Sequence, residues 1–241
     1  MYQEIQSSER LKNIIDSFWT FSKNETMENF KVLPDNCADL IFDFKQNKGF
    51  LSGVMTKYQL RELATASDLI GIRFKTENFG CLSQIPLNET KNLRVEISHI
   101  FPKTSLDILN KLNDLESLNA KIAFLENFVE TAFEQNSTKQ DQLILSVSQN
   151  IRSQNGIVNI SDLAKSHHIS LRQLERRFKK YIGLTLKEFS NIVRFHNTKK
   201  SIATLTEASL LEIAFDMGFF DHSHMTYEFK RISGNSPSYF R

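Results

Sequence analysis

The chain has 241 residues, of which 40% are hydrophobic and 24% are charged, with 20 Phe and only four Pro. This composition is that of a globular protein with a sizeable core, and it argues against long disorder. No run of about 18 apolar residues occurs, so we expect no membrane-spanning helix. The first residues carry no secretory signal pattern, which favours a cytoplasmic protein.

The charge is unevenly distributed along the chain. Residues 1–138 contain 15 Lys and Arg against 19 Asp and Glu, whereas residues 139–241 contain 15 against 9. The two parts therefore have net charges of −4 and +6. An acidic part followed by a basic part favours two domains, of which the second faces a polyanion.

The first hundred residues are predicted to form short strands. In residues 39–44, Leu40 and Phe42 alternate with more polar neighbours, which indicates a half-buried strand. Residues 69–74 form a second candidate strand, where Gly71 suggests a bulge or a close backbone approach. Residues 18–21 are a third, and we interpret Trp19 as a core residue rather than as part of a ligand site.

The spacing of apolar residues becomes helical from about residue 104. Residues 118–133 place their apolar side chains on one helix face, which is either a dimer interface or packs on its own sheet. The polar stretch 135–140 is the expected linker. We therefore predict an α+β domain over residues 1–137, β-rich over 1–100 and helical over 104–135, followed by an all-α domain over 138–241.

The basic part contains an internal repeat. Its pairs are separated by 50 residues before a turn and by 51 after it, so that one extra residue, Phe220, enters the second turn. The matched pairs are Ala164/Ala214, Ile169/Phe219, Leu174/Met225, Phe178/Phe229, Gly183/Gly234 and Phe189/Phe240. Each copy has a small residue inside its first helix, a polar turn and a capped second helix, as in a helix-turn-helix.

The two copies are expected over residues 159–182 and 209–233, with a linker helix over 185–205. This part resembles the tandem helix-turn-helix domain of AraC/XylS-type transcription regulators. The resemblance is carried by Leu163-Ala164, Ser170, Leu174, Arg176, Phe178-Lys179, Gly183, Phe189, Ile213-Ala214, Gly218-Phe219, Asp221, Ser223-His224, Phe229-Lys230-Arg231, Gly234, Ser236-Pro237 and Tyr239-Phe240-Arg241. His168 and Tyr227 depart from it, since a small turn residue is commoner at the first place and Arg or another polar residue is frequent at the second.

The acidic part resembles, less closely, the sensor-like domain that precedes this module in some family members. Residues 33–42 and 71–74 carry this similarity. It implies a β-rich effector or dimerisation domain, without indicating a ligand. Asp35, Asp39, Arg73 and Arg94 are polar residues here, and strand and turn positions explain them as well as a ligand site does.

The resemblance implies two recognition helices, over residues 171–181 and 221–231. The side chains expected to face bases are Arg172, Gln173, Glu175, Arg176, His222, Ser223, Thr226 and Tyr227. Recognition helices read bases with N-terminal residues, where Arg pairs with guanine and Glu with cytosine. The phosphate-contact candidates are Ser170, Lys179, Lys180, Lys230 and Arg231. The alternative interpretation of each of these candidates is an exposed surface residue without a role in DNA binding.

We therefore expect a bacterial, DNA-binding transcription regulator, not an enzyme, with double-stranded DNA as its partner. RNA polymerase, a small-molecule effector and a second copy of the chain are further partners to consider. No cofactor, catalytic residue or metal ligand is expected. The alternative is a DNA-targeted alkyl-transfer repair sensor that uses Cys37 or Cys81, although a nucleophilic Cys needs an activating group and only His99 occurs in the first part.

Overall fold

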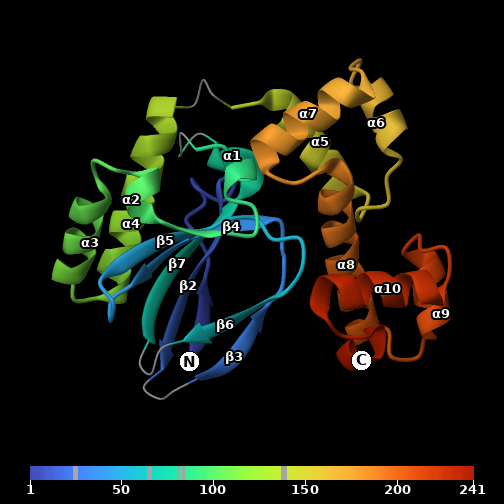
Figure 1. Cartoon of the computed structure of the whole chain (residues 1–241), viewed down its shortest axis with the longest axis horizontal. Helices are drawn as coiled ribbons and strands as arrows, with labels where there is room; N and C mark the ends of the chain where they lie inside the picture. The colour runs from blue at the N-terminus through green and yellow to red at the C-terminus, as the bar shows by residue number, and fades with distance from the viewer. Residues whose placement is uncertain (24–26, 64–66, 81, 83–84, 137–139) are drawn as a thin grey trace.

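The computed structural model describes residues 1–23, 27–63, 67–80, 82, 85–136 and 140–241. Its first part is β-rich with helices beside the sheet, and its second part consists of helices, as the sequence predicts (Figure 1). Cys81 and the centre of the expected linker, residues 137–139, lie outside the described residues. Among the described helices, none combines the length and the apolar character needed to cross a membrane.

The strands of the first part form two antiparallel sheets. The strands are β1 (Tyr2–Ile5), β2 (Ile15–Lys23), β3 (Met27–Val32), β4 (Cys37–Asp43), β5 (Lys48–Ser52), β6 (Gln59–Leu63), β7 (Ser67–Lys75) and β8 (Arg94–Glu96). The larger sheet has the order β1-β2-β7-β4-β5-β8, and β3 pairs with β6 in a separate two-stranded sheet. β2, β4 and β7 cover the three expected strands.

The central strands bury one face against the helices of this domain. Leu40 and Phe42 of β4, Ile70 and Ile72 of β7 and Phe18 of β2 are almost fully buried in one core. Because side chains alternate along a strand, the residues between them point to the opposite face of the sheet.

The helices and short turns of this domain lie beside the sheet. They are α1 (Thr76–Phe79), the 3-10 turn η1 (Leu87–Glu89), α2 (Ile97–Ile100), α3 (Ser105–Asp114) and α4 (Leu118–Asn136). Leu125 and Val129 of α4 are completely buried in the core that contains the sheet residues. The apolar face of residues 118–133 therefore packs on its own domain, which is one of its two expected roles.

The second part consists mainly of helices. They are α5 (Gln142–Ser153), α6 (Ile160–Ser166), α7 (Leu171–Ile182), α8 (Leu186–Thr204), α9 (Leu210–Asp216), α10 (His222–Ser233) and the 3-10 turn η3 (Pro237–Phe240). α7, α8 and α10 match the expected recognition and linker helices within one or two residues. Figure 1 shows α2, α3 and α4 on one side of the sheet and α6–α10 on the other.

The internal repeat is present in the backbone as well as in the sequence. Both turns use a left-handed residue at the same place, His168 with φ 52° and Gly218 with φ 68°. Ser170 and Asp221 cap the second helices, each accepting a hydrogen bond from a backbone N–H. The turn before Asp221 is one residue longer, which accounts for the shift from 50 to 51 and places Phe220 in the extra position.

The sheet domain contacts both helix-turn-helix pairs. Val54 lies in the core of α5, α7 and α8, and Lys91 forms an ion pair of 2.7 Å with Glu188 of α8. At the other pair, the Tyr58 backbone N–H donates to the Ile232 carbonyl oxygen at 2.7 Å.

Candidate nucleic-acid interface and ligand cavity

The face of the sheet opposite the core lines a cavity of about 530 Å³. The alternation along β4 and β7 places Asp39 and Arg73 on this face, and these two residues are direct partners across the strands. Trp19 on β2 is paired with Gly71 on β7. A Cβ at Gly71 would lie 2.0 Å from the indole ring, so only glycine leaves room for Trp19 here.

This arrangement confirms the expected close approach at Gly71 and refines the interpretation of Trp19. The indole is largely buried, as expected of a core residue, but it forms part of the cavity wall. The cavity lies between the large sheet and the β3–β6 pair, since Phe30 and Arg61 from that pair also line it.

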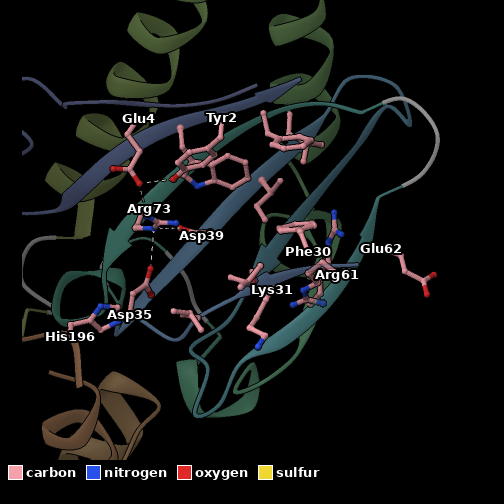
Figure 2. A pocket seen from close by; sticks show the side chains of 18 of the residues that line it. Tyr2, Glu4, Phe30, Lys31, Asp35, Asp39, Arg61, Glu62, Arg73 and His196 are labelled. Carbon is pink, nitrogen blue, oxygen red and sulfur yellow. Dashed lines mark hydrogen bonds and ion pairs between the residues drawn. The ribbon is translucent and has the colours of Figure 1, made fainter. Parts of the chain in front are cut away.

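A cluster of carboxylates surrounds Arg73 at one end of the cavity (Figure 2). Its guanidinium group lies 3.2 Å from carboxylate oxygens of Glu4, Asp35 and Asp39. Burial raises the pKa of Asp39 to about 7, and the Asp35 charge adds to this effect, whereas Arg73 opposes it. Three carboxylates around one cation favour protonation of one of them near neutral pH.

The linker helix α8 forms part of the cavity wall. His196 and Lys199 both line the cavity, although they belong to the helix that joins the two helix-turn-helix pairs. Nε2 of His196 is 2.7 Å from the Pro34 carbonyl oxygen, and burial lowers the pKa of this imidazole. A molecule in the cavity would thus touch the sheet domain and α8 at the same time.

The expected base-facing residues of the first recognition helix lie on the surface. Arg172, Glu175 and Arg176 are exposed on the first turns of α7, and Arg176 borders a shallow groove with Lys180. Gln173 is also exposed, but its side-chain oxygen accepts hydrogen bonds from the Ser170 backbone N–H and hydroxyl, completing a capping box.

Ser170 therefore holds the start of the helix, and Gln173 keeps only its amide hydrogens for another partner. Lys179 is exposed beside Lys180 near the end of the same helix. Arg177, which the sequence did not single out, donates to the Asp141 carboxylate at 2.9 Å and so joins α7 to the start of α5.

The second recognition helix presents a different set of side chains. His222 and Ser223 are exposed at its start, and Tyr227 is 66% exposed one turn later. The Thr226 hydroxyl oxygen is buried and makes no hydrogen bond within the described residues, so it does not reach the surface.

The two phosphate-contact candidates of this helix also differ from each other. Lys230 is exposed, whereas Arg231 is partly buried and donates to the Glu228 carboxylate at 2.6 Å. Lys230 is thus the cation of this pair that is available to an external partner.

Two domain families match the chain. Residues 3–96 match a family described as a domain of unknown function, DUF6597, and residues 163–241 match a family described as a helix-turn-helix domain. The second match covers the two helix pairs whose turns and caps repeat in the structure.

Curated relatives are named as bacterial regulators. The Msm operon regulatory protein of Streptococcus mutans is 30% identical over 141 residues, which are 58% of this chain and 50% of that protein. The HTH-type transcriptional activator RhaS of Escherichia coli is 34% identical over 80 residues, covering 33% of this chain and 28% of RhaS. Residues 163–241 form an AraC-type helix-turn-helix domain. The matched part of the chain covers half or less of the length of each of these two relatives.

Two solved structures have a low overall similarity to the chain. The carboxy-terminal domain of AraT from Geobacillus stearothermophilus aligns with 42% of this chain and 84% of its own length, at 20% identity and a TM-score of 0.39. ToxT from Vibrio cholerae, crystallised with (E)-4-(8-methylnaphthalen-1-yl)but-3-enoic acid, aligns with 99% of this chain and 97% of its own length. Its identity is 16% and its TM-score is 0.46.

The sequence did not indicate the cavity between the sheet domain and the linker helix α8. Asp35, Asp39, Arg73 and Arg94 were noted as polar residues whose positions had an ordinary explanation, and all four line it. Arg61 was not singled out at all. The available signal was the alternation itself, because Asp39 and Arg73 occupy the face of their strands that the core residues leave free.

Proposed function

We propose that the chain is a sequence-specific, DNA-binding transcription regulator of bacteria, acting in the cytoplasm. The observation that carries this proposal is the pair of matching helix-turn-helix units with exposed polar residues at the start of α7 and α10. In such units the second helix enters the major groove and contacts base edges with its N-terminal residues.

The linker helix supports simultaneous binding of both units. α8 has 19 residues, and at 1.5 Å per residue its length is about 28 Å. Successive major grooves on one face of DNA are about 34 Å apart. A helix of this length, with a recognition helix packed near each end, suits two neighbouring major grooves.

Arg172 and Arg176 are the proposed principal base readers, since each can pair bidentately with guanine. Glu175 lies between them and can accept from cytosine. Gln173 contributes through its free amide, while Ser170, Lys179 and Lys180 approach phosphates. Their exposure on one helix supports this assignment, and neither Arg172 nor Arg176 forms a hydrogen bond or an ion pair with another described residue.

In the second unit, His222, Ser223 and Tyr227 are the proposed base contacts, and Lys230 is the phosphate contact. Thr226 can join them only if its hydroxyl leaves its buried position. Arg231 would have to give up its ion pair with Glu228 to bind a phosphate, so its contribution is expected to be smaller.

We propose that a small molecule in the cavity controls DNA binding. The supporting observation is that His196 and Lys199 of α8 share the cavity with residues of the sheet. A ligand that favours one position of α8 would change the relation between the two recognition helices. Such a ligand shifts the equilibrium only by its difference in affinity for the two positions.

The alternative of a cysteine-dependent repair sensor gains no support from Cys37. Burial and the charges of Asp35 and Asp16 raise the pKa of this thiol well above its ordinary value. A nucleophilic Cys needs the opposite effect, because the thiolate is the reactive species. Contact with RNA polymerase and formation of a homodimer remain predictions.

The test is selection of binding sites from random duplex DNA by the full chain, followed by affinity measurement at several salt concentrations. We expect a defined site, and a slope of log affinity against log salt of about −0.9 for each phosphate contacted. Affinity that does not change with salt, or selection of no common sequence, would contradict the proposal.

A further inference from the structure

The cationic side chains that line the cavity differ in how many polar partners the protein provides for them. Arg73 is surrounded by three carboxylates. Nζ of Lys31 donates to the Asn235 side chain at 3.0 Å and lies over the Tyr58 ring, and Lys199 faces the Phe240 ring. Arg73 and Lys31 are therefore engaged by polar groups of the protein, whereas Lys199 has only this ring contact among the described residues.

Arg61 and Arg94 differ from Arg73 and Lys31, because no polar group of the described residues holds them. Both line the cavity, yet neither forms a hydrogen bond or an ion pair with any other described residue. The guanidinium of Arg94 lies over the Phe50 ring at 3.8 Å, which fixes its plane without neutralising its charge. Partial burial of the guanidinium groups lowers the pKa of both, although Arg94 as a residue is exposed, and the Arg61 charge lowers the pKa of Arg94 further.

The carboxylates nearby do not compensate this pair. Asp43 acts on Arg94 only at a distance, and its side chain accepts hydrogen bonds from the backbone N–H groups of Lys45 and Gln46. Glu62 also borders the cavity, but its carboxylate points away from Arg61 in Figure 2 and forms no ion pair with either arginine among the described residues. Two neighbouring guanidinium groups repel each other, and an anion bound between them would remove this cost.

We propose that Arg61 and Arg94 bind the carboxylate of a small organic ligand whose apolar body fills the cavity. The proposal rests on the proposed function, since it names the chemical class of the molecule that controls the protein. A guanidinium group matches a carboxylate with two parallel hydrogen bonds, which a lysine cannot provide. Arg61 on β6 and Arg94 on β8 come from the two different sheets, so the ligand would hold these sheets together.

The remaining wall accommodates the apolar body. Phe21, Phe30, Ile41 and Leu69 line the cavity, together with Trp19. Figure 2 shows Phe30 beside Arg61, and the Arg73 cluster at the opposite end of the cavity. An anionic head at Arg61 and Arg94 therefore places the apolar part of the ligand against aromatic rings, away from the carboxylates.

The experiment uses three probes with one body and different heads: 3-phenylpropanoate, 3-phenylpropanol and 3-phenylpropylamine. Trp19 is the one Trp of the chain and lies in the cavity wall, so its fluorescence reports binding to the full-length protein. We expect 3-phenylpropanoate to bind at least about tenfold more tightly than the alcohol, because charge-assisted hydrogen bonds to two guanidinium groups are stronger than those of a neutral hydroxyl. The amine is expected to bind least.

Arg61→Gln and Arg94→Gln should each weaken 3-phenylpropanoate about tenfold while leaving the affinity for 3-phenylpropanol unchanged. A residue that only supports the fold would affect both probes alike. Arg10→Gln is the matched control, since Arg10 is an exposed arginine that pairs with Glu130 outside the cavity. It should change neither affinity.

Equal affinities for the acid and the alcohol, equal effects of the variants on both probes, or failure of all three probes to bind would overturn the proposal. DNA binding by the same protein is measured separately. If DNA binds but the acid has no preference, the inference about the ligand fails while the DNA-binding function stands. If the acid binds through both arginines but DNA does not bind, the proposed function fails and the carboxylate site stands.

Discussion

Nε2 of His196 lies 2.7 Å from the backbone carbonyl oxygen of Pro34, and this contact joins the linker helix α8 to the turn before β4. The nitrogen must carry a proton to donate to a carbonyl oxygen. The imidazole also lines the cavity, so a single side chain touches the sheet domain, α8 and the space for a ligand.

His196→Leu keeps much of the side-chain volume but leaves the Pro34 carbonyl without its donor. We expect the free energy of unfolding to fall by about 1–3 kcal/mol, the cost of an unsatisfied buried acceptor. Urea unfolding of the full chain measures this change. His99→Leu, at an exposed histidine of α2, is the control and should have little effect. Equal losses in both variants would contradict the structural role of His196.

The same histidine should make stability depend on pH. Burial lowers its pKa in the folded state, so the unfolded chain, with an ordinary pKa of about 6.5, takes up the proton first as pH falls. The contribution of His196 is therefore fully present above about pH 6.5 and decreases below it. The difference in unfolding free energy between wild type and His196→Leu should shrink on acidification, and a constant difference would refute this.

Asp39 should produce a dependence of the opposite sign. Its pKa is raised to about 7 in the folded state, whereas an unfolded Asp titrates near about 3.9. Between these values the folded state holds the extra proton, so stability falls as pH rises, by up to about 1.4 kcal/mol per pH unit. Asp39→Asn should flatten this part of the curve.

The comparison uses Asp114→Asn, an exposed position on α3, as its control. Unfolding free energies are measured from pH 5 to pH 8 for the three proteins. As pH rises over this range, the unfolding free energies of wild type and of Asp114→Asn should fall by similar amounts. The unfolding free energy of Asp39→Asn should fall less. Parallel curves for all three would show that Asp39 is ionised throughout.

The sequence predicted the local features of the AraC-type domain well. The Ser170 cap, the extra residue at Phe220 and the buried pairs such as Phe178 and Phe229 depend on residues close in sequence, and the repeat shows each of them twice. The capping boxes at Thr185 and Ser209 follow the same local rule, although they were not singled out.

The cavity could not be predicted in the same way. Its lining joins Glu4, Arg73 and His196, which are far apart in the sequence, and only the order of strands in the sheet brings them together. The partner of a charged strand residue depends on register, as for Asp39 and Arg73. When the strand order is unknown, each of these charged residues can equally be interpreted as an exposed surface residue.

Gly183 provides a test of how the first helix pair rests on the sheet domain. Its φ is 85°, and a Cβ there would lie 2.8 Å from Val54 and 3.0 Å from the Leu87 backbone. Gly183→Ala should destabilise the full chain by at least about 1–2 kcal/mol, the cost of a left-handed conformation for a residue with a Cβ.

Gly80→Ala is the matched control for Gly183→Ala. Its backbone is helical, with φ −60°, and its Cβ would meet nothing closer than 3.4 Å. This variant should be neutral within about 0.5 kcal/mol. Thermal or urea unfolding distinguishes the two, and equal stabilities would contradict both the left-handed backbone at Gly183 and its close contact with Val54 and Leu87.

The two recognition helices expose side chains that differ in their ability to discriminate between bases. α7 presents Arg172 and Arg176, and a bidentate contact discriminates between bases by about 1–3 kcal/mol. α10 presents His222, Ser223 and Tyr227 at its surface, while the Thr226 hydroxyl is buried. The half-site read by α7 should therefore be the more sharply defined one.

Site selection is repeated with Arg176→Ala and with the double variant His222→Ala/Thr226→Ala. Arg176→Ala should relax preference at one or two base pairs of one half-site, and the double variant should cost less. Lys230→Ala should weaken all sequences alike and lower the salt slope by about one, because it removes a phosphate contact. Arg231→Ala should change the slope less, since Glu228 already holds its guanidinium. A sharper half-site under α10 than under α7 would reverse this ranking.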